Sequence, residues 1–244
     1  MRYLALASDY DGTLATHGQV AQQTLDALVA LQASGRRLVL VTGRQLEELL
    51  QVFPHAGIFD RIVAENGAVL YRPSTREQRT LASPPPEAFV HALRERAIEP
   101  LFTGRVVVAT LHPHEQAVLD VIRELGLELQ VILNKGSVMV LPAGVNKATG
   151  LIAALRELRL SPHNVAGVGD AENDSAFLRL CRCAVAVAGA LATLKETADW
   201  VTRGDSGAGV RELIRQLLQD DLEAIDRGIS RHLLPLGRHP STPC

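Results

Sequence analysis

The chain has 244 residues, of which 47% are hydrophobic and 21% charged, and its formal net charge is −2 at pH 7. This length can bury a large core, and the mixed, nearly balanced charge argues against nucleic acid or an anionic membrane as a partner. Its three cysteines do not make a disulfide framework, and the first apolar run meets Asp9 too early for a signal peptide. We therefore expect a cytoplasmic α/β protein.

The first third of the chain alternates short apolar runs with helical patterns. Tyr3–Ala7 is an unbroken apolar run, typical of a strand buried on both faces. A helical pattern ends near Gly35, and Arg37–Val41 is a second buried strand. Gln45–Phe53 predicts a helix, and Arg61–Ala64 predicts a third strand. This alternation predicts parallel strands joined by right-handed crossovers.

The pattern changes after Tyr71. Arg72–Thr75 is typical of a linker, and Ser83–Pro86 interrupts the chain again. We then expect, in order, a helix over Glu87–Ala97, a β-rich run over Arg105–Leu111, a helix from Pro113 to Leu125, and the strands Glu128–Leu133 and Ser137–Leu141, joined by a hairpin turn at Asn134–Gly136. Residues 72–145 therefore read as a small α+β module inserted into the parallel domain.

The alternation resumes after the insertion. We expect a helix over Leu151–Leu158, a strand over Asn164–Val168, a helix over Asn173–Leu180, a strand over Ala184–Ala188, a short helix after Gly189, a strand over Trp200–Thr202, a structural loop over Gly204–Gly209 and a helix over Val210–Leu218. The predicted fold is a Rossmann-like parallel-sheet core over residues 1–71 and 146–219. Residues 220–244 are expected to form a tail, or a linker to a further domain after the chain.

Polar residues follow the ends of several predicted strands. They are Asp9 and Asp11, Thr42, Asn66, and Asp170 with Asp174. The carboxyl ends of parallel strands share one sheet edge, so these side chains are expected to meet there. Lys147, one of three lysines, opens a helix directly after the insertion. Each residue alone also suits a solvated turn, a helix cap or a surface acid, but their common edge favours an active site.

Phosphoryl transfer is the chemistry that these residues can perform together. Asp9 would attack phosphorus and form an aspartyl-phosphate, while Asp11 moves protons. Thr42 and the adjacent backbone amides would bind phosphate oxygens, and Lys147 would supply positive charge. Carboxylates this close need a cation between them. The expected ligands of Mg²⁺ are Asp9, the backbone carbonyl of Asp11, and Asp170, with Asp174 as a ligand or as support for one.

Four segments resemble motifs of the haloacid dehalogenase superfamily of phosphatases, in the subgroup with a type IIB (C2) cap. They are Asp9–Leu14, Val41–Arg44, Val145–Gly150 and Gly167–Asp174, and Glu65–Ala68 is also usual in that subgroup. The motifs follow the family order over residues 1–219, with the cap between the second and third. The resemblance implies a magnesium-dependent phosphatase with Asp9 as nucleophile. It adds Gly43, Asn66 and Asn173 to Thr42 and Lys147 as substrate- or phosphate-binding residues. Arg44 either contacts phosphate or packs as a helix-start residue.

The expected substrate is a small phosphorylated metabolite. The small cap resembles that of archaeal phosphoglycolate phosphatases, whereas relatives with the same core act on sugar phosphates, and the fold does not choose between them. A phosphomutase is an alternative, for which Arg105 would hold a second phosphate. A regulatory module of a larger protein is another. Asn134 and Lys135 either face the substrate or form an exposed turn.

Overall fold

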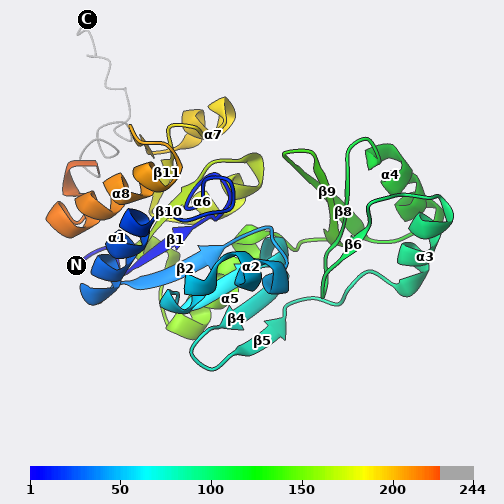
Figure 1. The fold of residues 1–244 in the computed structure, drawn as a ribbon, viewed down its shortest axis with the longest axis horizontal. Coiled ribbons are helices and arrows are strands. Elements are labelled where there is room, and N and C mark those ends of the chain that lie inside the picture. Colours follow the sequence, from blue (N-terminus) through cyan, green and yellow to red (C-terminus); the bar gives the residue numbers. More distant parts are fainter. Residues whose placement is uncertain (226–244) are drawn as a thin grey trace, which may run out of the picture.

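The computed structural model describes residues 1–225, which form a large and a small β-sheet, both packed with helices (Figure 1). In spatial order, the large sheet consists of β12 (Trp200–Val201), β11 (Cys183–Ala186), β10 (Val165–Gly169), β1 (Ala5–Ser8), β2 (Arg37–Val41), β3 (Arg61–Ala64), β4 (Val69–Arg72) and β5 (Glu77–Thr80). The small sheet consists of β6 (Phe102–Thr103), β7 (Val108–Leu111), β9 (Ser137–Pro142) and β8 (Leu129–Asn134).

The helices divide between the two sheets. Those of the large sheet are α1 (Gln22–Ala33), α2 (Leu46–Val52), α5 (Lys147–Leu158), α6 (Ser175–Leu178), α7 (Ala192–Thr197) and α8 (Ser206–Asp220). Four 3₁₀ turns accompany them: η1 (Pro54–Ile58), η2 (Glu65–Gly67), η3 (Pro162–Asn164) and η4 (Glu172–Asp174). The small sheet carries α3 (Glu87–Glu95) and α4 (Glu115–Glu124), which lie on its side away from the large sheet (Figure 1).

Strand β1 lies in the middle of the large sheet. It pairs in parallel with β2 on one side and with β10 on the other, so that Ala5 faces both Arg37 and Val165. All four of its residues are buried, as the unbroken apolar run predicts. The chain leaves β1 toward one edge of the sheet and returns on the other side of β1. The carboxyl end of β1 is therefore a switch point, where open α/β sheets bind their ligands.

Strand β9 of the small sheet has buried side chains on both of its faces. Val138 and Val140 pack into the cluster formed with α3 and α4, whereas Met139 and Leu141 belong to a second buried cluster. That second cluster includes Ala68, which precedes β4 of the large sheet. Because side chains alternate along a strand, one continuous apolar run joins the two parts of the molecule.

Several expectations about elements are confirmed and three are wrong. The α/β class, the mostly parallel sheet and the β8–β9 hairpin are as predicted. Arg72–Thr75 is not a linker, because β4 and β5 pair around it and extend the large sheet past residue 72 to Thr80. Helix α8 begins at Ser206, so the loop expected to end at Gly209 is shorter, and α4 begins at Glu115 rather than at Pro113.

The packed chain continues beyond residue 219. Leu222 is buried, and the carboxylate of Asp221 accepts a hydrogen bond from the Arg36 guanidinium at 2.8 Å. The rest of the expected tail, residues 226–244, lies outside the described residues. Across residues 1–225, no helix combines the length and apolar character needed to span a bilayer.

Candidate active site

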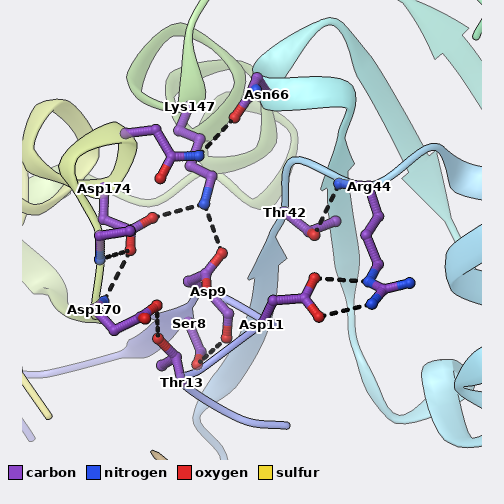
Figure 2. Close-up of polar contacts among 12 residues, drawn as sticks. Ser8, Asp9, Asp11, Thr13, Thr42, Arg44, Asn66, Lys147, Asp170 and Asp174 are labelled. Atoms are coloured by element: carbon purple, nitrogen blue, oxygen red, sulfur yellow. Dashed lines mark hydrogen bonds and ion pairs between the residues drawn. The ribbon is translucent and has the colours of Figure 1, made fainter. Parts of the chain in front are cut away.

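Asp9 is the first residue after β1 and lies at the centre of the site (Figure 2). Its backbone N–H donates to the carbonyl oxygen of Val168 at 3.0 Å, which ties it to the end of β10. Asp9 is 4% exposed, whereas the side chain of Asp11 is 38% exposed. The two carboxylates of the first motif therefore lie in different environments, one desolvated and one open to water.

Lys147 lies between two of the carboxylates. Its ammonium nitrogen is 2.5 Å from Oδ1 of Asp9 and 2.6 Å from Oδ1 of Asp174, and the residue is 2% exposed (Figure 2). Lys147 is the first residue of α5, which Asn146 and Thr149 fix with a capping box. A buried ammonium is stable only when it is paired, so the two carboxylates determine its position.

The loop after β10 supplies the remaining acids, Asp170 and Asp174. The N–H groups of Asp170 and Ala171 donate to Oδ2 of Asp174 at 2.9 and 3.0 Å, which fixes the loop after β10. The hydroxyl of Thr13 donates to Oδ1 of Asp170 at 3.0 Å. One carboxylate oxygen from each of Asp9, Asp170 and Asp174 lies within 4.8 Å of the others, although Asp9 is distant in sequence from the other two acids.

The electrostatics of this cluster favour a further cation. Burial raises the pKa of Asp9, the nearby Asp174 carboxylate raises it further, and Lys147 acts in the opposite direction. Burial also raises the pKa of Asp170, against the effect of its hydrogen bond from Lys135. Burial disfavours charged Lys147, but the Asp174 and Asp9 carboxylates outweigh burial and raise its pKa. Three carboxylates thus face two ammonium groups, those of Lys135 and Lys147, which leaves a place for further positive charge.

The residues present fit a divalent cation such as Mg²⁺, because carboxylate and carbonyl oxygens are the ligands it prefers. The ammonium of Lys135 lies where such a cation would bind, 2.7 Å from Oδ2 of Asp170 and 3.1 Å from the backbone carbonyl oxygen of Asp11. Gly12 keeps this place open, since a Cβ there would lie 2.4 Å from Oδ2 of Asp170. Asp11 contributes its carbonyl at this point, not its carboxylate.

The carboxylate of Asp11 turns toward Arg44 instead (Figure 2). The guanidinium binds both of its oxygens, Nε to Oδ2 at 2.6 Å and Nη2 to Oδ1 at 2.8 Å. The backbone N–H of Arg44 donates to the Thr42 hydroxyl at 3.1 Å, and Thr42 itself is fully buried. The second motif therefore positions the exposed acid of the first motif, a contact that the sequence pattern did not predict.

Asn66 and Asn173 connect the remaining predicted residues. Nδ2 of Asn173 donates to Oδ1 of Asn66 at 3.0 Å, and Oδ1 of Asn173 is buried with no hydrogen-bond partner among residues 1–225. Asn66 has a φ of 52°, in the left-handed region. A Cβ at Gly43 would meet the Asn66 amide oxygen at 3.3 Å. The unpaired amide oxygen of Asn173 marks a place where a ligand could donate a hydrogen bond.

A cavity of about 630 Å³ lies between the large sheet and the inserted module. Of the predicted site residues, it is lined by Asp9, Asp11, Gly43, Arg44, Lys147, Asp170 and Asn173. Thr42, Asn66 and Asp174 are fully buried. The structure thus brings all ten residues to one region, and their individual roles stay predictions.

Two residues near the site were not among the ten predicted site residues. Lys135, for which the sequence left open either a substrate-facing position or an exposed turn, reaches across from the β8–β9 turn to Asp170. Glu65 is fully buried, and its carboxylate accepts the backbone N–H groups of Arg105, Val106 and Val107 at 2.8 to 2.9 Å. This contact joins η2 of the large part to the inserted module.

Comparisons with known proteins agree on one family. Residues 6–117 and 131–214 match the model of the haloacid dehalogenase-like hydrolases. A phosphoglycolate phosphatase of Pyrobaculum islandicum is 26% identical over 235 residues, which cover 91% of this chain and 98% of the relative. The phosphoglycolate phosphatase of Halorubrum lacusprofundi is 30% identical over 220 residues, covering 84% of this chain and 94% of the relative.

Solved structures share the fold. A haloacid dehalogenase-like hydrolase from Bacteroides thetaiotaomicron superposes with a TM-score of 0.75 at 19% identity, covering 88% of this chain and 99% of its own. A sugar phosphatase of subclass IIB superposes with a TM-score of 0.71 at 19% identity, covering 87% of this chain and 98% of its own.

The chain therefore belongs to the haloacid dehalogenase-like hydrolase family, as its four motifs indicated. The predicted enzyme class, a phosphatase of this family, is confirmed by the family match together with the phosphatases among its relatives. From here on, the inserted module, which holds β6 to β9, α3 and α4, is called the cap.

Proposed function

We propose that this enzyme hydrolyses the phosphate ester of a small metabolite, phosphoglycolate or a sugar phosphate, with Mg²⁺ and through an aspartyl-phosphate. The contrast between Asp9 and Asp11 carries the proposal. Asp9 is 4% exposed and paired with Lys147, which suits a positioned nucleophile, whereas the more exposed Asp11 can exchange protons with water. The names of the relatives, phosphoglycolate phosphatases and a sugar phosphatase, support the substrate classes.

Hydrolysis would take two steps, in which Asp9 is the nucleophile and Asp11 transfers the protons. An oxygen of Asp9 attacks phosphorus, the ester P–O bond breaks, and Asp11 gives its proton to the departing alcohol oxygen. Asp11 then takes a proton from water, the resulting hydroxide attacks phosphorus, and the Asp9 carboxylate leaves with the electrons of its P–O bond. The products are inorganic phosphate and the alcohol, and both carboxyl groups return to their starting states.

The other site residues bind and orient in this scheme. Lys147 holds the oxygen Oδ1 of Asp9 and adds positive charge beside the phosphate. Asp9, Asp170 and the carbonyl of Asp11 would hold Mg²⁺, with Asp174 fixing the loop. When bound, Mg²⁺ supplies the positive charge that offsets the charge of the phosphoryl oxygens. Arg44 keeps Asp11 at the cavity wall and would release one of its two carboxylate oxygens when Asp11 carries a proton.

The phosphomutase alternative loses its main support. A mutase would need cap cations for a second phosphate, and Arg105 was the candidate. The guanidinium of Arg105 pairs instead with Glu47, at 2.9 Å, and Arg105 is not among the residues that line the cavity. Hydrolysis therefore explains the site better than transfer to a second hydroxyl.

Phosphate release with and without Mg²⁺, from phosphoglycolate and from glucose 6-phosphate, tests the proposal. We expect Mg²⁺-dependent turnover by the wild type and a loss of roughly 10⁴-fold or more in Asp9→Asn, because the amide is a poor nucleophile. Asp26→Asn, an exposed amide substitution on α1, is the matched control and should retain full activity. Absence of turnover with either ester, in a protein that still binds Mg²⁺ and phosphate, would overturn the proposal.

A further inference from the structure

The cations around the cavity differ in how they are held. Lys147 is buried between Asp9 and Asp174, and Arg44 is bound by Asp11 and by Glu48. Both belong to the large part of the molecule. Among the described residues that line the cavity, the cap contributes one cation, Lys135, next to largely apolar side chains such as those of Phe102, Leu111 and Met139.

Lys135 lies at the tip of the β8–β9 turn, where it has a φ of 47° and precedes Gly136 with a φ of 84°. Strand β8 packs against η4, so the turn is held close to the loop that carries Asp170. The side chain of Lys135 is 50% exposed, and its ammonium nitrogen contacts Oδ2 of Asp170 and the carbonyl of Asp11. The lysine thus extends from the cap to the phosphate side of the cavity.

These partners of Lys135 are also the atoms that the proposed function assigns to Mg²⁺. A carboxylate oxygen that binds Mg²⁺ cannot keep a full hydrogen bond to an ammonium at the same place. The half-exposed ammonium would then be free to bind another anion that enters the cavity. Under the proposed function the phosphoryl group binds beside Asp9, so the rest of the substrate would face the cap residues that line the cavity and could provide that anion.

We propose that Lys135 is a specificity-determining residue, which binds a carboxylate on the alcohol part of the substrate. This inference rests on the proposed function and deepens it, because it selects the phosphate ester of a small hydroxy acid over a neutral sugar phosphate. The lysine leaves Asp170 when the metal binds and pairs with the substrate carboxylate instead. A single ammonium on an otherwise uncharged cap wall matches a single negative charge on the alcohol.

Two esters of the same size separate this role from general catalysis: 2-phosphoglycolate, and 2-hydroxyethyl phosphate, in which a neutral CH₂OH replaces the carboxylate. We expect the wild type to prefer 2-phosphoglycolate in kcat/KM. Lys135→Met should lower kcat/KM for 2-phosphoglycolate by about 10- to 100-fold, the range for a charge-assisted hydrogen bond, and for 2-hydroxyethyl phosphate by less than about threefold. Lys135→Arg should keep most of the preference. Lys195→Met, on α7 and away from the cavity, is the matched control.

Calorimetric titration of Mg²⁺ without substrate gives a readout that is independent of turnover. Lys135→Met should bind Mg²⁺ about threefold more tightly or better than the wild type, because no ammonium competes for Asp170. Equal Mg²⁺ affinities would overturn the competition between Lys135 and the metal. Equal losses on the two esters, or no loss on either, would overturn the role in specificity while leaving the phosphatase intact. A wild type that hydrolyses glucose 6-phosphate but neither of these two esters would overturn this inference and leave the proposed function intact. A wild type that hydrolyses none of the three, with Mg²⁺ bound, would overturn the proposed function on which this inference rests.

Discussion

The lack of a side chain at Gly12 allows Asp170 to lie close to the backbone that follows Asp9 and Asp11. Gly12 has a φ of 86°, and a Cβ there would meet Oδ2 of Asp170 at 2.4 Å and the ammonium of Lys135 at 2.7 Å. Two separate demands therefore fall on this position, a left-handed backbone and an empty space. Only glycine satisfies both without a shift of Asp170.

Gly12→Ala and Gly35→Ala separate these two demands. Gly35 has nearly the same φ, 89°, but open space around its Cβ position. Both variants should lose about 1 kcal/mol of unfolding free energy in urea titrations, because alanine is disfavoured in the left-handed region. Gly12→Ala alone should also lose Mg²⁺ affinity and phosphatase activity, by about tenfold or more, since Asp170 must move. Full Mg²⁺ affinity in Gly12→Ala would show that the space at residue 12 has no role in the site.

At the scale of elements, the start of α5 places the central cation. Oδ1 of Asn146 accepts the N–H groups of Ala148 and Thr149, and the Thr149 hydroxyl accepts the N–H of Asn146. The next turn of the helix contains Gly150, where a Cβ would lie 2.6 Å from Cα of Gly67. The capping box and the close packing at Gly150 together fix the position of Lys147, which is the first residue of the helix.

Asn146→Ala should therefore affect stability and catalysis together. Loss of the capping side chain is expected to lower the unfolding free energy by about 1 kcal/mol, as measured by chemical denaturation. It should also lower kcat, because the frayed first turn carries Lys147. Asn146→Asp, which retains the acceptor, should restore both quantities. Ser161→Ala removes a cap from η3, away from the cavity, and should leave kcat unchanged.

The elements that could be predicted from sequence are those with a strong local signal. The buried strands β1, β2 and β3 are unbroken apolar runs, and the β8–β9 turn has a polar, glycine-containing sequence. Strand β5 has no such signal, because all four of its residues are exposed. It is held by pairing with β4 and by Arg79, which reaches Glu157 on α5. The contact with Glu157 depends on a residue that is distant in sequence, and the polar residues of β5 give no local sign of it.

The same distinction applies to the site. Asp9, Thr42 and Asp170 each follow a buried parallel strand, so their meeting at one sheet edge follows from the topology of those strands. The contact of Lys135 with Asp170 depends instead on how the cap lies against the large part. A turn residue in isolation gives no information about that placement.

At the scale of the whole molecule, Glu65 connects the catalytic part to the cap. Its buried carboxylate is the common acceptor for three consecutive backbone N–H groups, and a Cβ at Gly104 would lie 2.7 Å from Cδ of Glu65. A second contact, between Glu47 and Arg105, also crosses from one part to the other, but both of its side chains are largely exposed. We expect the buried contact of Glu65 to be stronger than the exposed ion pair between Glu47 and Arg105.

Glu65→Gln should weaken the contact between the cap and the large part of the molecule. The amide NH₂ group would face a backbone N–H where the wild type offers an acceptor, at a cost of about 1–3 kcal/mol. We expect faster hydrogen exchange at residues 105–107 and a larger radius of gyration in solution scattering. Glu47→Gln, which breaks the exposed ion pair, is the matched control and should change neither quantity. Unchanged exchange at residues 105–107 in Glu65→Gln would contradict this role.

The central position of β1 also has a consequence for synthesis on the ribosome. Ala5 pairs with Val165, so one edge of β1 has no partner strand until 160 further residues have been made. At ordinary translation rates this delay lasts roughly ten to thirty seconds. The cap strands lie close together in sequence and all emerge within that interval, so the cap has time to fold first. Asp9 and Asp170 then come together only after the cap has been made, and the nascent β1 edge is the segment that chaperones would need to protect.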